Sequence, residues 1–154
     1  MPKSVSVGLL FVRVCAGLAM AAHGYPKIVN PTGWAGHTTA TIPWTGMTFG
    51  PLPVWLQALV AAVEFFGGLA LVFGVLTRVA ALAICIEMLV ALFFFELPHG
   101  APFVARGHTL EPNLMYLTTT FMLFLTGAGA ISLDALLFAP PQHAIVRDET
   151  NRAA

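Results

Sequence analysis

The sequence has little charge, few cysteines and no excess of either sign. Of its 154 residues only 9% are charged and 58% are hydrophobic, whereas about 25% of the residues in an ordinary soluble domain are charged. Lysine and arginine together number seven, as do aspartate and glutamate, which argues against a basic surface for nucleic acid. Cys15 and Cys85 stand alone, without a CxxC spacing, and we expect both to be buried and inert. The composition therefore predicts a membrane protein and excludes nucleic-acid binding.

Four apolar runs are long enough to cross a hydrocarbon core about 30 Å thick, which takes roughly 20 helical residues. They cover residues 5–22, 54–76, 79–97 and 114–133. Only Thr77 and Arg78 separate the second run from the third, so these two helices are expected to lie antiparallel and side by side. The sequence predicts an all-α fold, a four-transmembrane-helix bundle over residues 1–139 with a long first outer loop from Gly24 to Pro53. Residues 140–154 are expected to form a short cytoplasmic tail.

The distribution of basic residues predicts that both termini are cytoplasmic. Four basic residues lie on the side of the termini and two on the other, namely Lys3, Arg78, Arg147 and Arg152 against Lys27 and Arg106. The first apolar run resembles a cleavable signal peptide, but Arg13 in its middle is costly for a disposable segment. We therefore expect this helix to be retained.

Three charged residues fall within the apolar runs: Arg13, Glu64 and Glu87. A charge at mid-bilayer costs at least about 2.5 kcal/mol and persists where pairing, water or function sustains it. Small residues at helical spacing surround these positions, which indicates that they face other helices. We interpret Arg13 and Glu64 as a structural ion pair. One cation for two carboxyl groups then leaves Glu87 as a candidate for a carboxyl that is held neutral and accepts protons.

A second polar set lies at the expected outer ends of the helices and comprises His23, Lys27, Glu96, His99, Arg106, His108 and Glu111. Helix ends converge in a bundle, so His23, Lys27, His99 and Glu111 could form one shallow pocket beneath the long loop. Histidine suits such a pocket because it titrates near neutral pH. The alternative is that these residues anchor the helix ends in the headgroup layer. No short ligand spacing such as HExxH links the histidines, so we expect no metal site.

Several short motifs, in this order and spacing, resemble those of the DoxX family of small four-helix membrane proteins. The resemblance covers residues 7–134 and is carried by Arg13, Gly17, His23-Gly24-x-x-Lys27, Glu64-Phe65-x-Gly67-Gly68, Gly74-x-x-Thr77-Arg78-x-Ala80-Ala81 and Gly127-x-Gly129-x-x-Ser132-Leu133-Asp134. Relatives include the quinone-reducing membrane part of an archaeal thiosulfate oxidation system and bacterial members linked to thiol and oxidant homeostasis. Glu87 lies where the family pattern would have an apolar residue.

Two functional interpretations follow from the polar residues and the resemblance. In the first, the chain is an integral subunit of a redox or respiratory assembly in the bacterial inner membrane, with a quinone-interacting pocket at the outer helix ends. Its electrons would come from a membrane or membrane-associated redox partner, and its cofactor would be a quinone that is not covalently bound. The candidate catalytic residues are Glu64, His23, His99 and Glu87, and the candidate cofactor-binding residues are His23, Lys27, Glu64, His99 and Glu111.

In the second interpretation, the chain is a non-catalytic anchoring subunit that stabilises a larger membrane complex. Both interpretations place the chain in contact with the lipid bilayer and with other membrane proteins. They leave open whether the chain is an enzyme and whether it forms a homo-oligomer.

Overall fold

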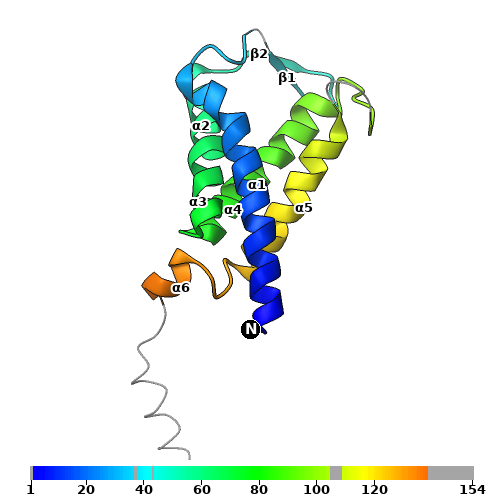
Figure 1. Ribbon diagram of the computed structural model, residues 1–154. Coiled ribbons are helices and arrows are strands. Elements are labelled where there is room, and N and C mark those ends of the chain that lie inside the picture. The colour runs from blue at the N-terminus through cyan, green and yellow to red at the C-terminus, as the bar shows by residue number, and fades with distance from the viewer. Residues whose placement is uncertain (1, 37, 43, 105–108, 139–154) are drawn as a thin grey trace, which may run out of the picture.

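The computed structural model describes residues 2–36, 38–42, 44–104 and 109–138, and most of these residues are helical (Figure 1). The helical elements are α1 (Lys3–Val29), α2 (Val54–Ala62), the π-helical turn η1 (Val63–Gly67), α3 (Gly68–Phe73), α4 (Thr77–Ala91), the π-helical turn η2 (Leu92–Glu96), α5 (Leu110–Thr126) and α6 (Leu133–Phe138). Two short strands, β1 (Thr39–Thr41) and β2 (Thr48–Pro51), pair antiparallel. The N-terminus and α6 lie at one end of the bundle and the strands at the other (Figure 1).

Three helical stretches in the described part of the chain are long and apolar enough to cross a membrane. They are Lys3–Val29, Val54–Phe73 and Thr77–Glu96, with 27, 20 and 20 residues. The protein is thus a helical membrane protein, as its composition predicts. Helix α5 has 17 residues, or roughly 26 Å at 1.5 Å per residue, so a fourth crossing stays a prediction.

The first and last apolar runs end at different residues from those expected. Helix α1 continues to Val29 and so carries His23 and Lys27 on its last turns. Helix α5 ends at Thr126 because Gly127 and Gly129 both adopt φ values of +78°, which a right-handed helix does not allow. The expectation that the fourth apolar run is helical to residue 133 is therefore wrong, since these two glycines form the loop between α5 and α6.

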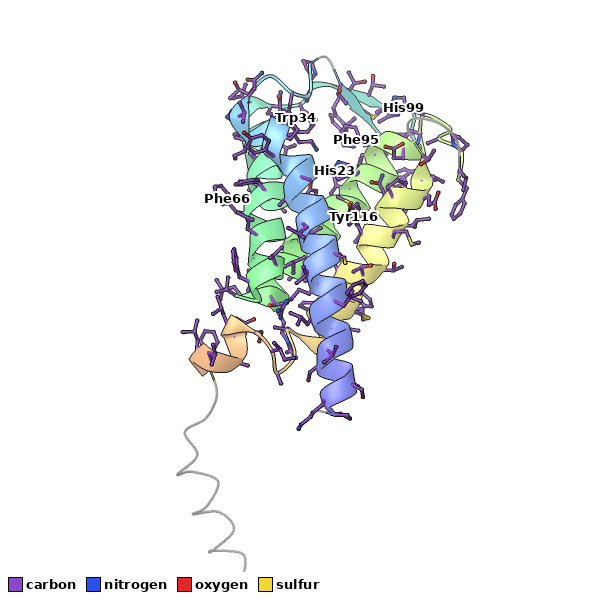
Figure 2. The ribbon with its side chains drawn as sticks, in the orientation of Figure 1. His23, Trp34, Phe66, Phe95, His99 and Tyr116 are labelled. Atoms are coloured by element: carbon purple, nitrogen blue, oxygen red, sulfur yellow. The ribbon has the colours of Figure 1, made fainter. Side chains whose placement is uncertain are left out.

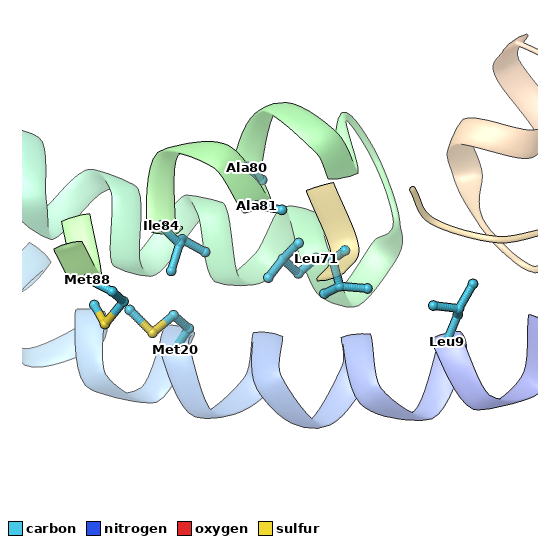
Figure 3. Close-up of a cluster of buried hydrophobic side chains, with 8 residues drawn as sticks. Leu9, Met20, Leu71, Ala80, Ala81, Ile84 and Met88 are labelled. Atoms are coloured by element: carbon cyan, nitrogen blue, oxygen red, sulfur yellow. The ribbon is translucent and has the colours of Figure 1, made fainter. Parts of the chain in front are cut away.

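Small residues set the packing of α1 against the second apolar run. A Cβ atom on Gly17 would stand 2.6 Å from the carbonyl oxygen of Gly68, and one on Gly68 would stand 2.5 Å from the amide nitrogen of Ala21. The two backbones are therefore nearly in contact, as expected of a small-residue stripe. The buried cluster beside this seam comprises Leu9, Met20, Leu71, Ala80, Ala81, Ile84, Met88 and Leu123 (Figure 3). Cys85 is buried as expected, but Cys15 is exposed.

Arg13 fastens the loop after α5 to the first helix. Its side chain is only 1% exposed. Its Nη1 donates to the carbonyl of Ala128 at 2.8 Å and its Nη2 to that of Ile131 at 2.9 Å. The guanidinium also lies against Gly74, where a Cβ atom would clash with it. Arg13 therefore satisfies backbone carbonyls of the loop between α5 and α6, which have no helical partners.

Asp134 closes the turn between α3 and α4 from a distant part of the chain. Its two carboxylate oxygens accept hydrogen bonds from the amides of Leu76 at 2.7 Å and Thr77 at 2.9 Å. Leu76 has a φ of +47°, an uncommon conformation for a leucine. The carboxylate caps the first turn of α4, whose amides have no partner within the helix.

Part of the expected organisation falls outside the described residues. The expected tail at residues 140–154 lies there, with Arg147 and Arg152 in it, and so do Arg106 and His108. The loop from Gly24 to Pro53 is partly ordered into the last turns of α1 and the hairpin β1–β2. Strand β1 contacts η2, so the hairpin lies over the end of α4 that continues into η2.

Candidate functional site

A partly buried ion pair joins the end of α1 to the π-helical turn η1. Lys27 Nζ lies 2.5 Å from Glu64 Oε1, and the Lys27 and Glu64 side chains are 25% and 7% exposed. The backbone of Gly24 touches that of Glu64 and Phe65 so closely that a Cβ atom would clash there. Because Lys27 follows Gly24 by about one helical turn, this contact places its ammonium group over Glu64. The π-helical turn, a feature often found at functional sites, holds the carboxylate.

The expected ion pair between Arg13 and Glu64 is wrong. Gly24 lies level with Glu64, whereas Arg13 lies level with Gly74. Arg13 and Gly24 are separated by eleven positions, or roughly 16 Å along a helix. The guanidinium therefore binds carbonyls at one end of the bundle, and Lys27 supplies the cation for Glu64 at the other.

A second carboxyl group adjoins this pair. Helix α4 packs against η1, and Glu87 on α4 lies close enough to Glu64 for the two carboxyl groups to interact. The Oε2 atoms of both residues are buried and have no donor partner within the described structure. Lys27 forms the one ion pair found among the described residues. One ammonium group therefore faces two carboxyl groups in an otherwise apolar region.

Aromatic side chains lie beside Lys27 and Glu64, and Figure 2 labels Trp34, His23 and Tyr116 among them. The ring centroid of Trp34 lies 4.4 Å from Lys27 Nζ, a cation–π geometry, and its Nε1 donates to the Gln57 carbonyl at 3.0 Å. Tyr116 on α5 lies close enough to Glu64 to interact with its charge. Its ring meets that of His23 edge to face, with centroids 6.1 Å apart. Tyr116 and Trp34 therefore belong to the candidate site, although sequence reasoning did not assign them to it.

The structure brings together only part of the expected pocket. His23, Lys27, Glu64 and Glu87 lie around one centre, and His23 is exposed at its edge. His99 is exposed, and its Nδ1 bonds the carbonyl of Phe95 one turn earlier in its own helix. In Figure 2 it lies beside Phe95 and apart from His23. Glu111 is exposed on the first turn of α5. Among the described residues, no contact joins His99 or Glu111 to the other expected site residues, and their part in the pocket stays a prediction.

A separate, wholly apolar groove of about 470 Å³ runs between α4 and α5. It is lined by Leu82, Cys85, Ile86, Leu89, Leu117, Thr118, Phe121 and Phe124. None of the charged residues described above borders it. It is a surface for hydrocarbon rather than a site for polar chemistry.

The chain matches the DoxX family model over residues 8–97. It is 30% identical over 138 residues to "Putative oxidoreductase CatD" of Bacillus subtilis (strain 168), which covers 90% of this chain and 92% of that protein. It is 34% identical over 139 residues to "Inner membrane protein YqjF" of Escherichia coli (strain K12), which covers 89% of this chain and 97% of that protein. No solved structure matches the chain.

Proposed function

Because the chain belongs to the DoxX family, we propose that it is a subunit of a redox assembly in the bacterial inner membrane and that it binds a quinone beside Lys27 and Glu64. The names of two relatives support this proposal, because one is called a putative oxidoreductase and the other an inner membrane protein. The chain would cross the membrane several times with both termini in the cytoplasm. The proposed quinone site then lies toward the outer face.

The observation that carries the proposal is the partly buried ion pair between Lys27 and Glu64. Buried charges in a membrane bundle are costly and are retained for register or for function. This pair lies at the end of the bundle, and a quarter of the Lys27 side chain is exposed, so a ligand entering from the outer leaflet can reach it. The hydrogen bonds of Arg13 and the close glycine contacts already fix the packing of α1. The ion pair is therefore not needed to set the helix register, which favours a role in function.

The groups around the pair match what a quinone requires. Each quinone oxygen needs a hydrogen-bond donor, and the ring needs an apolar or aromatic surround. Lys27 has three ammonium N–H donors, and one of them forms the hydrogen bond to Glu64. The phenol of Tyr116 and the imidazole of His23 are further donors within the same group of rings. We propose that the electrons come from a membrane-associated redox protein bound to this chain.

Quinone binding is tested by the melting temperature of the full chain in lipid nanodiscs, with short-tailed ubiquinone and menaquinone analogues. A ligand at 100 times its Kd stabilises the native state by about 2.7 kcal/mol, so a clear rise in melting temperature is expected. Lys27→Met should abolish the rise. Lys3→Met makes the same chemical change at an exposed position at the opposite end of α1 and should leave it intact. The absence of any rise in the unaltered protein at saturating analogue would contradict the proposal.

The second candidate function is a non-catalytic anchoring subunit. Two sets of hydrogen bonds favour it. Arg13 ties α1 to the loop after α5, and Asp134 of α6 ties that helix to the start of α4. These bonds hold the bundle together and need no ligand. His23→Ala separates the two functions because His23 is exposed and its loss spares the core. In a quinone site, this substitution lowers the turnover of the purified assembly while the amount of folded protein is unchanged. In an anchoring subunit, turnover per complex is unaffected.

A further inference from the structure

The carboxyl groups of Glu64 and Glu87 meet inside the bundle without enough donors to satisfy them. Helix α4 packs against η1, and the two carboxyl groups are close enough to interact with each other. Each also has a buried Oε2 without a donor partner in the described structure, and Glu64 is only 5% exposed. An ionised carboxylate has acceptors but no donor. Two neighbouring carboxyl groups can therefore hydrogen-bond to each other only if one of them holds a proton.

The charges around this contact lead to the same conclusion. Helix α1 contributes the ammonium group of Lys27, η1 contributes Glu64 and α4 contributes Glu87. Helix α5 contributes the phenol of Tyr116, whose ring meets that of the exposed His23 edge to face. With both carboxyl groups ionised, a net negative charge would be left in an apolar bundle. With one proton between them, the group of three is neutral.

We propose that Glu64 and Glu87 share one exchangeable proton and that together they form a proton-binding site within the bundle. Lys27 pairs directly with Glu64, so Glu64 keeps its charge and Glu87 releases the proton. The step is the dissociation of the Glu87 carboxylic acid into a carboxylate and a proton, with Lys27 remaining an ammonium ion throughout. Delivery of this proton to a reduced quinone rests on the proposed function, whereas the presence of the proton does not.

Infrared spectroscopy of the full chain in lipid nanodiscs at neutral pH tests this site. A protonated carboxyl group has a C=O stretching band distinct from that of carboxylates, and the band should shift in ²H₂O. Glu87→Gln and Glu64→Gln should each abolish it, because the one carboxylate that remains then pairs with Lys27. Glu111→Gln is the matched control, since Glu111 is exposed and lies outside this group. It should leave the band unchanged.

Lys27→Met supplies a test in the opposite direction. Without the cation, both carboxyl groups should hold protons, and the intensity of the band should roughly double. No band in the unaltered protein, or a band that survives either glutamate substitution at full intensity, would overturn the proposal. The unaltered protein and Lys27→Met decide the matter even if a glutamate variant does not fold. If the band is present but no quinone binds, the proton site stands and the proposed function fails. If quinone binds but the band is absent, the proposed function stands and the proton site fails.

Discussion

Removal of the Arg13 guanidinium should strongly destabilise the bundle. The side chain is 1% exposed and donates to two backbone carbonyls, at 2.8 and 2.9 Å. A hydrogen bond from a charged donor contributes about 1.5–3 kcal/mol net, so the two together contribute roughly 3–6 kcal/mol. Arg13→Met loses both bonds and leaves two carbonyls without a partner. Arg13→Lys keeps the charge but lacks the forked donor, so it should lose about half as much.

The free energy of unfolding is measured by SDS titration in mixed micelles, with helicity followed by circular dichroism. Arg78→Met is the matched control. Arg78 is exposed and makes one longer bond of 3.2 Å to the Leu125 carbonyl, so its loss should cost less than about 1 kcal/mol. If Arg13→Met costs no more than Arg78→Met, the carbonyl bonds do not hold the loop and the reasoning fails. If Arg13→Lys is as damaging as Arg13→Met, the forked geometry is not the reason.

Three further predictions concern the packing and the charges, each checked by the melting temperature in nanodiscs. Gly68→Ala should destabilise by about 1–3 kcal/mol, because its Cβ would stand 2.5 Å from the backbone of α1; Gly8→Ala, with nothing within 4 Å, should not lower the melting temperature. Lys27→Met should cost up to about 3–5 kcal/mol, because Glu64 loses its cation and must take up a proton, and adding Glu64→Leu should restore most of that loss; no restoration would argue against the pair. Asp134→Ala should cost about 1–2 kcal/mol through the lost helix cap, and an unchanged melting temperature would mean that the turn holds without it.

The apolar runs were predictable because hydropathy depends on local composition. The helices of the first three runs are found near their expected positions, and the stripe that holds Glu64 and Gly68 faces α1 as its spacing indicates. The ends of the first and last runs were less predictable. The first apolar run, at residues 5–22, does not indicate that α1 continues past Pro26 to Val29. Positive φ values at Gly127 and Gly129 likewise break a run that is apolar throughout.

The partner of Glu64 could not be read from the sequence. Arg13 is the most deeply placed cation in the apolar runs, whereas Lys27 lies five residues beyond the expected end of the first run at residue 22. Which cation reaches Glu64 depends on the relative height of two antiparallel helices. The contact of Gly24 with the backbone of η1 sets that height. Shifting α1 by the roughly 16 Å between the two levels would exchange one pairing for the other.

The sequence by itself determined that the chain is an apolar, helical membrane protein of the DoxX family with a few polar residues inside it. Those properties follow from composition, from the length of each run and from motif order. Only the tertiary structure decided that Lys27, Glu64 and Glu87 form one centre, while Arg13 binds carbonyls at the other end. Hydropathy depends on neighbouring residues along the chain, so it can be read from the sequence. A charge pair depends on the register between helices that are far apart in sequence, so it cannot.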